Sequence, residues 1–182
     1  MAKLISKTYG EALFETAMDV KNVDGLFEEA EAVRGTLMEN PKLLQLFNHP
    51  NIIKEEKIQV MKSVFEGRVS AEMSSFLQIV IEKGRQNELD AILAYFIGKV
   101  KEYKHIGIAY VTSAAELTDT QKKQIEEKLL ETTGYEKIEM NFSVDESLIG
   151  GLVIRIGDRV VDSSIKSRLY EMKKELMKIQ LN

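Results

Sequence analysis

Apolar residues recur at steps of three and four through the first hundred residues of the chain. This spacing runs from Leu4 to Val20 and again from Leu26 to Leu37, and each run predicts an amphipathic helix. Asn40-Pro41 ends the second run, because the residue before a proline avoids the helical region. Four shorter apolar runs follow, up to Tyr103, and the six runs together predict a compact helical bundle. Residues that open or end these later helices are Pro41, His49-Pro50, Gly67, Ser70 and Gly84.

The period of the apolar positions changes abruptly after this helical part. From Ile106 to Thr112, large side chains alternate with small ones, which predicts a strand. The segment Thr118-Asp119-Thr120-Gln121 then fits a capping box and predicts a helix. Alternation from Ile138 to Val144 predicts a second strand, and Leu152 to Val161 predicts two more, divided by a hairpin turn at Gly157-Asp158.

A last helix is predicted to follow Ser163, which can cap it. Its apolar positions are 4, 3, 4 and 3 residues apart, the spacing of a stripe along one side of a helix. Packing of this stripe on the sheet of its own domain is the simplest interpretation, and a heptad partner is the alternative. From Ser163 to Asn182 there are five basic and two acidic residues, a net charge of +3. The stripe consists of Ile165, Leu169, Met172, Leu176 and Ile179.

These patterns predict an α+β protein of two domains. Residues 1–105 are expected to form a six-helix bundle. Residues 106–182 are expected to form a small mixed α/β domain in the order strand, helix, three strands, helix. No low-complexity or Gly/Ser-rich linker separates the two, so we expect a short joint between the domains.

Composition and charge narrow the functional classes. The chain has 25 Lys and Arg residues and 29 Asp and Glu residues, so it lacks the basic excess that is typical of nucleic-acid-binding proteins. The chain has no cysteine, which excludes disulfides, thiolate zinc sites and thiol nucleophiles. Its longest uncharged stretches have 11 residues, too short to span a bilayer, and its start lacks the apolar segment of a secretory signal. We therefore expect a cytoplasmic protein that binds no nucleic acid.

Candidate chemistry is sparse. Neither His49 nor His105 has a nearby carboxylate or second histidine at metal-ligand spacing, so both are interpreted as structural or solvent-exposed. Gly150-Gly151 lies among strands and does not open a helix, which favours a turn over a phosphate loop. An enzyme or nucleotide-binding domain stays open as the alternative function, with acids that crowd one edge of the small sheet. These acids are Asp145, Glu146, Asp158 and Asp162.

One helix of the predicted bundle is apolar on most of its circumference. It runs from Ser70 to Lys83, and the first helix of the chain carries two apolar stripes. Bundle core is the simpler explanation for both. The alternative is a groove between the two helices that accepts an amphipathic helix of a partner protein.

The second domain carries a motif that resembles the signature of the ATP synthase delta subunit family, whose mitochondrial relative confers oligomycin sensitivity. The motif covers residues 144–158 and 161–169, and near the start residues 9–14 are similar to the opening helix of that family. Glu82-Lys83-Gly84-Arg85 falls where the family ends its fifth helix. The signature positions, interpreted as structural, are Asp145, Leu148, Gly150, Gly151, Gly157, Asp162, Ser164, Ile165 and Leu169.

The resemblance implies a non-catalytic stator subunit without a cofactor, present in one copy at the cytoplasmic side of the cell membrane. Its first domain would bind the amino-terminal helix of an alpha subunit, and its second domain the b subunits of the peripheral stalk. Contact with the membrane would be indirect. In the second domain the candidates facing the stalk are Lys173 and Lys174 on the last helix. The positions that match the family's groove for the alpha helix are Tyr9, Ala12, Leu13, Ile79 and Val80.

The chain departs from this family at one position of its opening helix. Gly10 stands where alanine is usual, and glycine costs about 1 kcal/mol relative to alanine inside a helix. We therefore expect a slightly weaker first helix.

Overall fold

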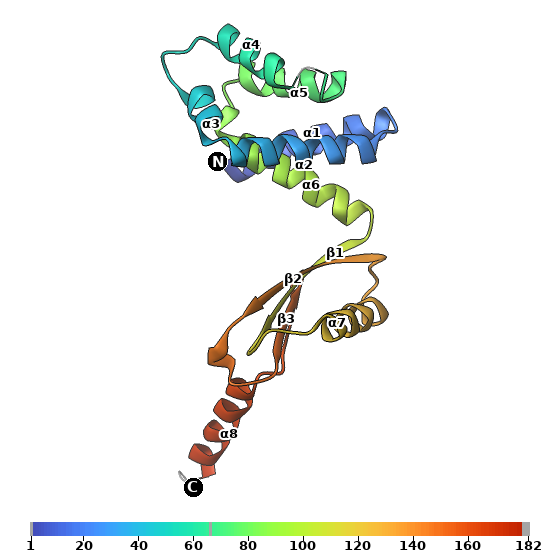
Figure 1. The fold of residues 1–182 in the computed structure, drawn as a ribbon, viewed down its shortest axis with the longest axis vertical. Coiled ribbons are helices and arrows are strands. Elements are labelled where there is room, and N and C mark those ends of the chain that lie inside the picture. The colour runs from blue at the N-terminus through green and yellow to red at the C-terminus, as the bar shows by residue number, and fades with distance from the viewer. Residues whose placement is uncertain (1, 66, 180–182) are drawn as a thin grey trace. The chain divides into compact units, whose positions relative to one another are not determined.

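A computed structural model describes residues 2–65 and 67–179 of the chain (Figure 1). The chain divides into two compact units, Met1–Lys101 and Glu102–Asn182, which are called the helical unit and the mixed unit below. The predicted α+β class is confirmed, because helices alone build the first unit and the second contains a four-stranded sheet. Residues 180–182 lie outside the described residues.

The six helices predicted for the first part are present. Pro41 opens α3, and the hydroxyl of Ser70 caps α5 by accepting a hydrogen bond from the Met73 amide at 3.2 Å. Gly84 follows α5 at a φ of +68°, a left-handed conformation that glycine adopts without strain. The bounds are α1 Ala2–Asp19, α2 Val23–Glu39, α3 Pro41–Asn48, α4 Lys54–Phe65, α5 Ala71–Glu82, the short 3₁₀ helix η1 Gln86–Glu88, and α6 Leu89–Tyr103.

The helical unit has one core to which all six helices contribute. Side chains spaced at three and four residues, as the sequence predicts, fill it. The largest of them are almost completely buried, which gives the unit the apolar burial that a stable domain needs. They include Leu13, Leu26, Leu37, Phe47, Met61, Met73, Leu77, Ile81, Ile92, Leu93 and Phe96.

Gly10 has a packing role that its helix propensity does not suggest. A Cβ atom at this position would lie 2.5 Å from Cδ1 of Tyr95 and 3.3 Å from the carbonyl oxygen of Ile92. The missing side chain therefore lets α1 approach α6 closely. The Tyr95 hydroxyl also donates a hydrogen bond to Oε1 of Glu11 at 3.1 Å, across the same contact.

The mixed unit is built around a sheet in the strand order β2-β1-β3-β4. β1 and β2 are parallel, with Ala109 opposite Met140, and the other two neighbouring pairs are antiparallel. The hairpin turn predicted at Gly157-Asp158 joins β3 to β4. The bounds are β1 Ile106–Ser113, α7 Asp119–Thr132, β2 Lys137–Val144, the 3₁₀ helix η2 Glu146–Leu148, β3 Leu152–Ile156, β4 Arg159–Asp162 and α8 Ile165–Ile179.

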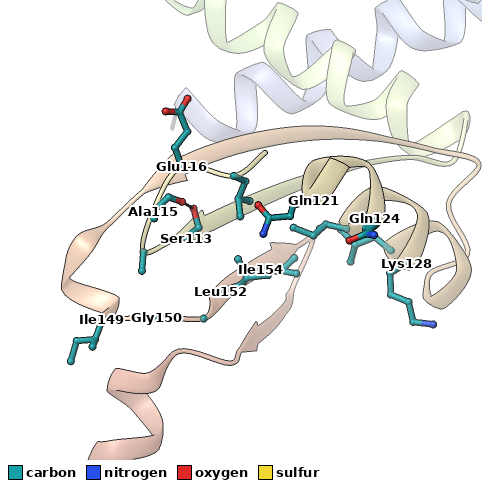
Figure 2. Close-up of a pocket in the computed structure, with 15 residues that line it drawn as sticks. Ser113, Ala115, Glu116, Gln121, Gln124, Lys128, Ile149, Gly150, Leu152 and Ile154 are labelled. Atoms are coloured by element: carbon teal, nitrogen blue, oxygen red, sulfur yellow. Dashed lines mark hydrogen bonds between the residues drawn. The ribbon is translucent and has the colours of Figure 1, made fainter. Parts of the chain in front are cut away.

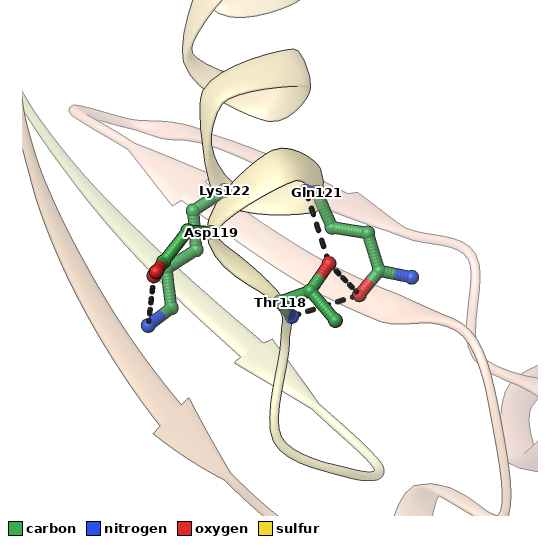
Figure 3. Close-up of polar contacts among 4 residues, drawn as sticks. All are labelled: Thr118, Asp119, Gln121 and Lys122. Atoms are coloured by element: carbon green, nitrogen blue, oxygen red, sulfur yellow. Dashed lines mark hydrogen bonds and ion pairs between the residues drawn. The ribbon is translucent and has the colours of Figure 1, made fainter.

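The capping box predicted for the connecting helix is present. The hydroxyl of Thr118 accepts a hydrogen bond from the Gln121 amide at 3.3 Å, and the Gln121 side chain accepts one from the Thr118 amide at 2.9 Å (Figure 3). Lys122 and Asp119 form an ion pair one turn into the helix. These contacts fix where α7 starts after the loop that leaves β1.

α7 packs on one face of the sheet. Leu129, Leu130 and Tyr135 contact a small buried cluster of Ala109, Ile138 and Ile156. By register Ile154 and Leu152 of β3 lie on this same face, and they are only partly buried. The cover that α7 provides is thus incomplete on the β3 side.

The last helix differs from the simplest prediction. All residues from 168 to 177 are exposed, and Leu169, Met172 and Leu176 of the apolar stripe are 52%, 59% and 64% exposed. The stripe therefore does not pack on the sheet of its own domain, and that expectation is wrong. The side chain of Ile179, the last residue of the stripe, lies outside the described residues.

The start of α8 also needs a correction. The hydroxyl that caps the helix is that of Ser164, which accepts a hydrogen bond from the Ser167 amide at 3.2 Å. The predicted cap, Ser163, instead pairs with Leu152 through its amide and its hydroxyl. Ser163 thus still belongs to the β3–β4 pairing, and the helix begins one residue later than predicted.

Candidate interaction surfaces

A groove of about 360 Å³ lies between α1 and α5 on the helical unit; it is called the α1–α5 groove below. Ile79 forms part of its α5 side and is 47% exposed, whereas Leu13 lies beneath it and is 1% exposed. Its surface is mainly apolar, with one carboxylate, that of Glu72. The lining residues are Leu13, Thr16, Ala71, Glu72, Ser75, Phe76 and Ile79.

The residues matched to the family's groove divide into three groups. Leu13 and Ile79 line the α1–α5 groove. Ala12 is exposed and lies one helical turn before Thr16, and Tyr9 is partly buried, so both extend the α1 wall. Val80 is fully buried in the core and offers no surface to a partner, so its inclusion as a contact residue is corrected.

On α5 the sequence predicted Ile79 as a groove residue but not Glu72 or Phe76, which line the same groove. Glu72, Phe76 and Ile79 are spaced by four and three residues, so they share one face of the helix. The opposite face holds Met73 and Leu77, which are buried in the core. The signal was present as a second apolar face, but the spacing alone does not say which face the bundle leaves open.

A larger cavity of about 710 Å³ lies in the mixed unit between α7 and β3, and is called the α7–β3 groove below (Figure 2). Leu152 and Ile154 of β3 line it on the sheet side, at the place where α7 leaves the sheet uncovered. On the α7 side it is lined by the apolar side chains Ile125 and Leu129 together with polar ones. The polar residues of the lining are Ser113, Glu116, Gln121, Gln124 and Lys128.

Charge is unevenly distributed along the α7–β3 groove. Glu116 lies near its end at the loop after β1, and Lys128 lies towards the other end, on α7 (Figure 2). A groove lined by apolar and polar side chains suits an amphipathic helix, whose apolar side chains recur every three or four residues. The sequence did not predict this groove. Its two sides, α7 and β3, are far apart in the chain and come together only because β3 pairs with β1.

α8 presents a third surface. Its apolar stripe is exposed, as are Lys173 and Lys174, the residues predicted to face the stalk. Exposed leucine and methionine side chains arranged along one helix are typical of a surface that a second helix covers. The basic residues beside the stripe favour a partner with acidic side chains at its rim.

The signature motif builds the junction between the sheet and α8. Leu148 is buried, and the amide of Ile165 donates a hydrogen bond to the Gly150 carbonyl oxygen at 3.0 Å. A Cβ atom on Gly151 would lie 2.3 Å from the carbonyl oxygen of Ser163. Gly151 is therefore needed where two backbone segments approach each other closely, which agrees with a structural role for the motif.

The acidic residues considered for catalysis do not gather at one place. Asp145 and Glu146 come directly after β2, and Asp162 is the last residue of β4. The carboxyl ends of these two strands lie at the same edge of the sheet, whereas Asp158 lies in the β3–β4 turn at the opposite edge. The expectation that all four crowd one edge is thus wrong. Within residues 2–65 and 67–179 no group of three His, Asp or Glu side chains is placed to hold a metal ion.

Two of the carboxylates at this edge, those of Asp162 and Asp145, accept local hydrogen bonds. The hydroxyl of Ser167 and the amide of Ser164 donate to Asp162, and these bonds lower its pKa from the ordinary aspartate value. Ser147 lowers the pKa of Asp145 in the same way, through its side chain and its amide. Both groups thus stay ionised and accept hydrogen bonds, which is the role of a cap rather than of a catalytic acid.

The two histidines have structural surroundings. Nδ1 of His49 accepts a hydrogen bond from the Asn51 amide at 3.3 Å after α3. His105 has a φ of +53°, and its carbonyl oxygen accepts a hydrogen bond from the Glu136 amide at 2.9 Å, next to the start of β1.

In the described part of the chain no helix combines the length and the hydropathy that crossing a membrane requires.

Comparison with known proteins gives a consistent result. The family model of the ATP synthase delta (OSCP) subunit matches residues 5–176. The ATP synthase subunit delta of Lachnoclostridium phytofermentans is 54% identical over 181 residues, which is 100% of both chains, and that of Desulforamulus reducens is 34% identical over 95% of both. A chain in the cryo-EM structure of the Toxoplasma gondii mitochondrial ATP synthase hexamer has the same fold, with a TM-score of 0.76 and 16% identity over 94% of this chain and 97% of that chain.

Proposed function

Because this chain belongs to the ATP synthase delta (OSCP) subunit family, we propose that its two units bind different parts of ATP synthase. It is a non-catalytic stator subunit, peripheral to the membrane-embedded part of the complex. The enzyme alternative has no support, since neither the family nor the arrangement of the acidic residues favours it. The helical unit is proposed to bind the catalytic head, and the mixed unit the peripheral stalk.

The proposed contact of the helical unit is with the amino-terminal helix of an alpha subunit. The α1–α5 groove is open, and Ile79 and Phe76 offer apolar side chains that a helix can cover. Glu72 favours a basic side chain on the bound helix at that end of the groove. The contact residues are proposed to be Thr16, Glu72, Phe76 and Ile79 together with Tyr9 and Ala12, while Leu13 supports them from below.

The proposed contact of the mixed unit is with the b subunits of the stalk. Its exposed apolar stripe on α8 carries this proposal, because Leu169, Met172 and Leu176 are each more than half exposed in the chain by itself. Burying the exposed part of each side chain contributes about 1–2 kcal/mol. Lys173 and Lys174 lie beside the stripe and favour an acidic or amphipathic helix.

A stator subunit must bind its partners tightly, and it need not catalyse a reaction. Torque on the catalytic head during proton-driven ATP synthesis acts on the link between head and stalk. A protein with two separate apolar binding surfaces can carry that load with no catalytic residue or cofactor. The further proposals are that one copy serves each complex, at the cytoplasmic side of the cell membrane, and that contact with the membrane is indirect.

We also propose that the two units fold as domains with a boundary at His105. The period change at Ile106 and the compact division near Lys101 support this boundary. A fragment of residues 1–105 is expected to show a cooperative thermal transition and a helical circular dichroism spectrum. An unfolded fragment would contradict independent folding of the first domain.

Photo-crosslinking in membranes that contain the assembled enzyme tests the assignment of partners. A benzoylphenylalanine at Thr16 is expected to crosslink to an alpha subunit, and one at Leu169 to a b subunit. A benzoylphenylalanine at Met38, which is 65% exposed on α2 and lies outside both surfaces, serves as the control. Crosslinks from Thr16 to b, or from Leu169 to alpha, would contradict the proposal.

A further inference from the structure

α8 is attached to its domain through its first turn. Beyond that turn, residues 168–177 are all exposed. At the first turn, the amide of Ile165 bonds to Gly150, and Nζ of Lys166 donates to the hydroxyl of Ser147 at 3.2 Å. A helix that is held at one end and projects from its domain has its direction set by that end alone (Figure 1).

Asp162 is the polar centre of this attachment. Its Oδ1 accepts a hydrogen bond from the Ser164 amide at 2.8 Å, and its Oδ2 accepts one from the Ser167 hydroxyl at 2.6 Å. Asp162 is the last residue of β4, whereas Ser167 lies in the first turn of α8. One carboxylate therefore connects the end of the strand to the beginning of the helix, where a negative charge is also favoured by the helix dipole.

Gly150 and Gly151 pack closely against the chain at the start of α8. A Cβ atom on Gly150 would lie 2.6 Å from Cδ1 of Ile165, and one on Gly151 would lie 2.3 Å from the carbonyl oxygen of Ser163. Gly151 has a φ of +80°, which a larger residue adopts only with strain. The loop after η2 thus lies directly against the chain that enters α8.

We propose that Asp162, together with the Gly150-Gly151 loop, is a positioning site that sets the direction of α8 and so presents its apolar stripe to the stalk at a fixed angle. This inference rests on the proposed stalk contact of α8. The distance from Ile165 to Met177 is about 18 Å at 1.5 Å per residue, so a swing of about 20° moves the far end by about 6 Å. A fixed direction lowers the ordering cost of binding, because the helix is already oriented when its partner arrives.

Distance measurement by electron paramagnetic resonance tests the positioning directly. The chain has no cysteine, so spin labels can be attached at Asn141→Cys on β2 and Glu175→Cys on α8 without removing native residues. The unaltered junction is expected to give a narrow distance distribution. Asp162→Ala is expected to broaden it, and Ser167→Ala, which removes one of the two hydrogen bonds, to broaden it less.

Thr118→Ala is the matched control. It removes the cap of α7 in the same domain but touches no group at the start of α8, so the distance distribution is expected to stay narrow. Circular dichroism and thermal unfolding show whether each variant is folded. If Asp162→Ala fails to fold, Ser167→Ala alone decides the question. A narrow, unshifted distribution in the folded variants overturns the proposal.

Binding of a soluble b-subunit dimer supplies the second readout. Asp162→Ala leaves the apolar stripe and the lysines of α8 in place, yet it is expected to weaken this binding by about tenfold, because the helix must be oriented on binding. A broadened distance distribution in Asp162→Ala together with unchanged affinity for the dimer would overturn the proposal that the direction of α8 affects binding. If the wild-type chain does not bind the dimer, the proposed stalk contact fails, while the distances still decide whether Asp162 positions α8.

Discussion

The helical and mixed units carry the same kind of apolar periodicity but use it differently. In the described residues, nineteen buried apolar side chains form one cluster in the helical unit, and the corresponding cluster of the mixed unit has three. The stripe of α6 is buried against other helices, whereas the stripe of α8 is exposed. A regular apolar stripe therefore does not show that a helix packs against its own chain.

The largest effect is expected from charges placed in the stripe of α8. The double variant Leu169→Asp with Leu176→Asp is expected to lower the affinity for a soluble b-subunit dimer by at least about 100-fold, because two carboxylates would be desolvated. Its melting temperature is expected to stay near that of the wild type, since both side chains are exposed. Titration calorimetry measures the affinity.

The control for this pair is Met38→Asp with Ile53→Asp, two exposed apolar residues of the helical unit. This control is expected to bind the dimer normally. Wild-type affinity in the α8 variant would show that its stripe is not the stalk surface.

A charge in the α1–α5 groove is expected to act on the other partner. Ile79→Asp is expected to weaken binding of an alpha amino-terminal peptide by about 30-fold or more, since the carboxylate enters a groove whose lining is mainly apolar. Fluorescence anisotropy of a labelled peptide checks this. Leu13→Asp and Val80→Asp are poor tests, because both side chains are buried and the variants are expected to unfold. A stable Ile79→Asp variant with unchanged affinity would place the alpha helix elsewhere.

The close approach of α1 and α6 predicts a loss of stability at Gly10. Gly10→Ala gains about 1 kcal/mol of helix propensity, but its Cβ clashes with Tyr95, and such overpacking costs about 1–3 kcal/mol. We expect a net loss in urea unfolding that disappears in the background of Tyr95→Ala. Gly35→Ala on α2, where a Cβ meets nothing within 4 Å, is expected to be stabilising. Equal stabilisation at both glycines would contradict the packing role of Gly10.

Acid is expected to weaken the mixed unit through its two capping carboxylates. The pKa values of Asp162 and Asp145 are lowered in the folded chain by hydrogen bonds from serines. Their contribution to stability is therefore complete above the unfolded pKa of about 4 and is lost as the pH falls towards the folded values. Urea unfolding followed from pH 7 to pH 3 is expected to show this loss, with a smaller loss in Asp162→Asn. Parallel curves for the two proteins would contradict it.

The smallest effect is expected from the exposed lysines of α8. Lys173→Glu with Lys174→Glu is expected to slow association with the b-subunit dimer several-fold and to flatten its salt dependence, because exposed charges act mainly on the rate of encounter. Folding stability is expected to change little. Stopped-flow measurements at two salt concentrations check both expectations. An unchanged salt dependence would exclude electrostatic steering by this pair.

Local patterns predicted the elements of this fold well. The end of α6 at Tyr103, the capping box at Thr118 and the turn at Gly157-Asp158 follow from a few neighbouring residues, so the sequence alone sufficed for them. The exposure of the α8 stripe could not be predicted, because an apolar stripe has the same period whether the sheet of its own domain covers it or not. Ser163 was mistaken for the cap because Ser163 and Ser164 both have the chemistry of one.

The sites were less predictable than the elements, for a related reason. Ile79 and Val80 are neighbouring apolar residues of α5, and only the packing of the bundle decides that one is exposed and the other buried. The α7–β3 groove depends on which strands pair, which no local pattern encodes. Helix propensity alone predicted a weaker helix at Gly10. Its packing role could not be predicted, because its contact, Tyr95, is distant in the sequence.

Simultaneous binding is the most direct test of a link between head and stalk. The b-subunit dimer is titrated into the full-length chain, first alone and then with the chain saturated by the alpha amino-terminal peptide, and calorimetry gives the dissociation constant in each case. Two separate surfaces require the same constant and the same stoichiometry in both titrations, with a ternary complex at the end. Displacement of the peptide by the dimer would show that the two partners share one surface and would contradict the proposed function.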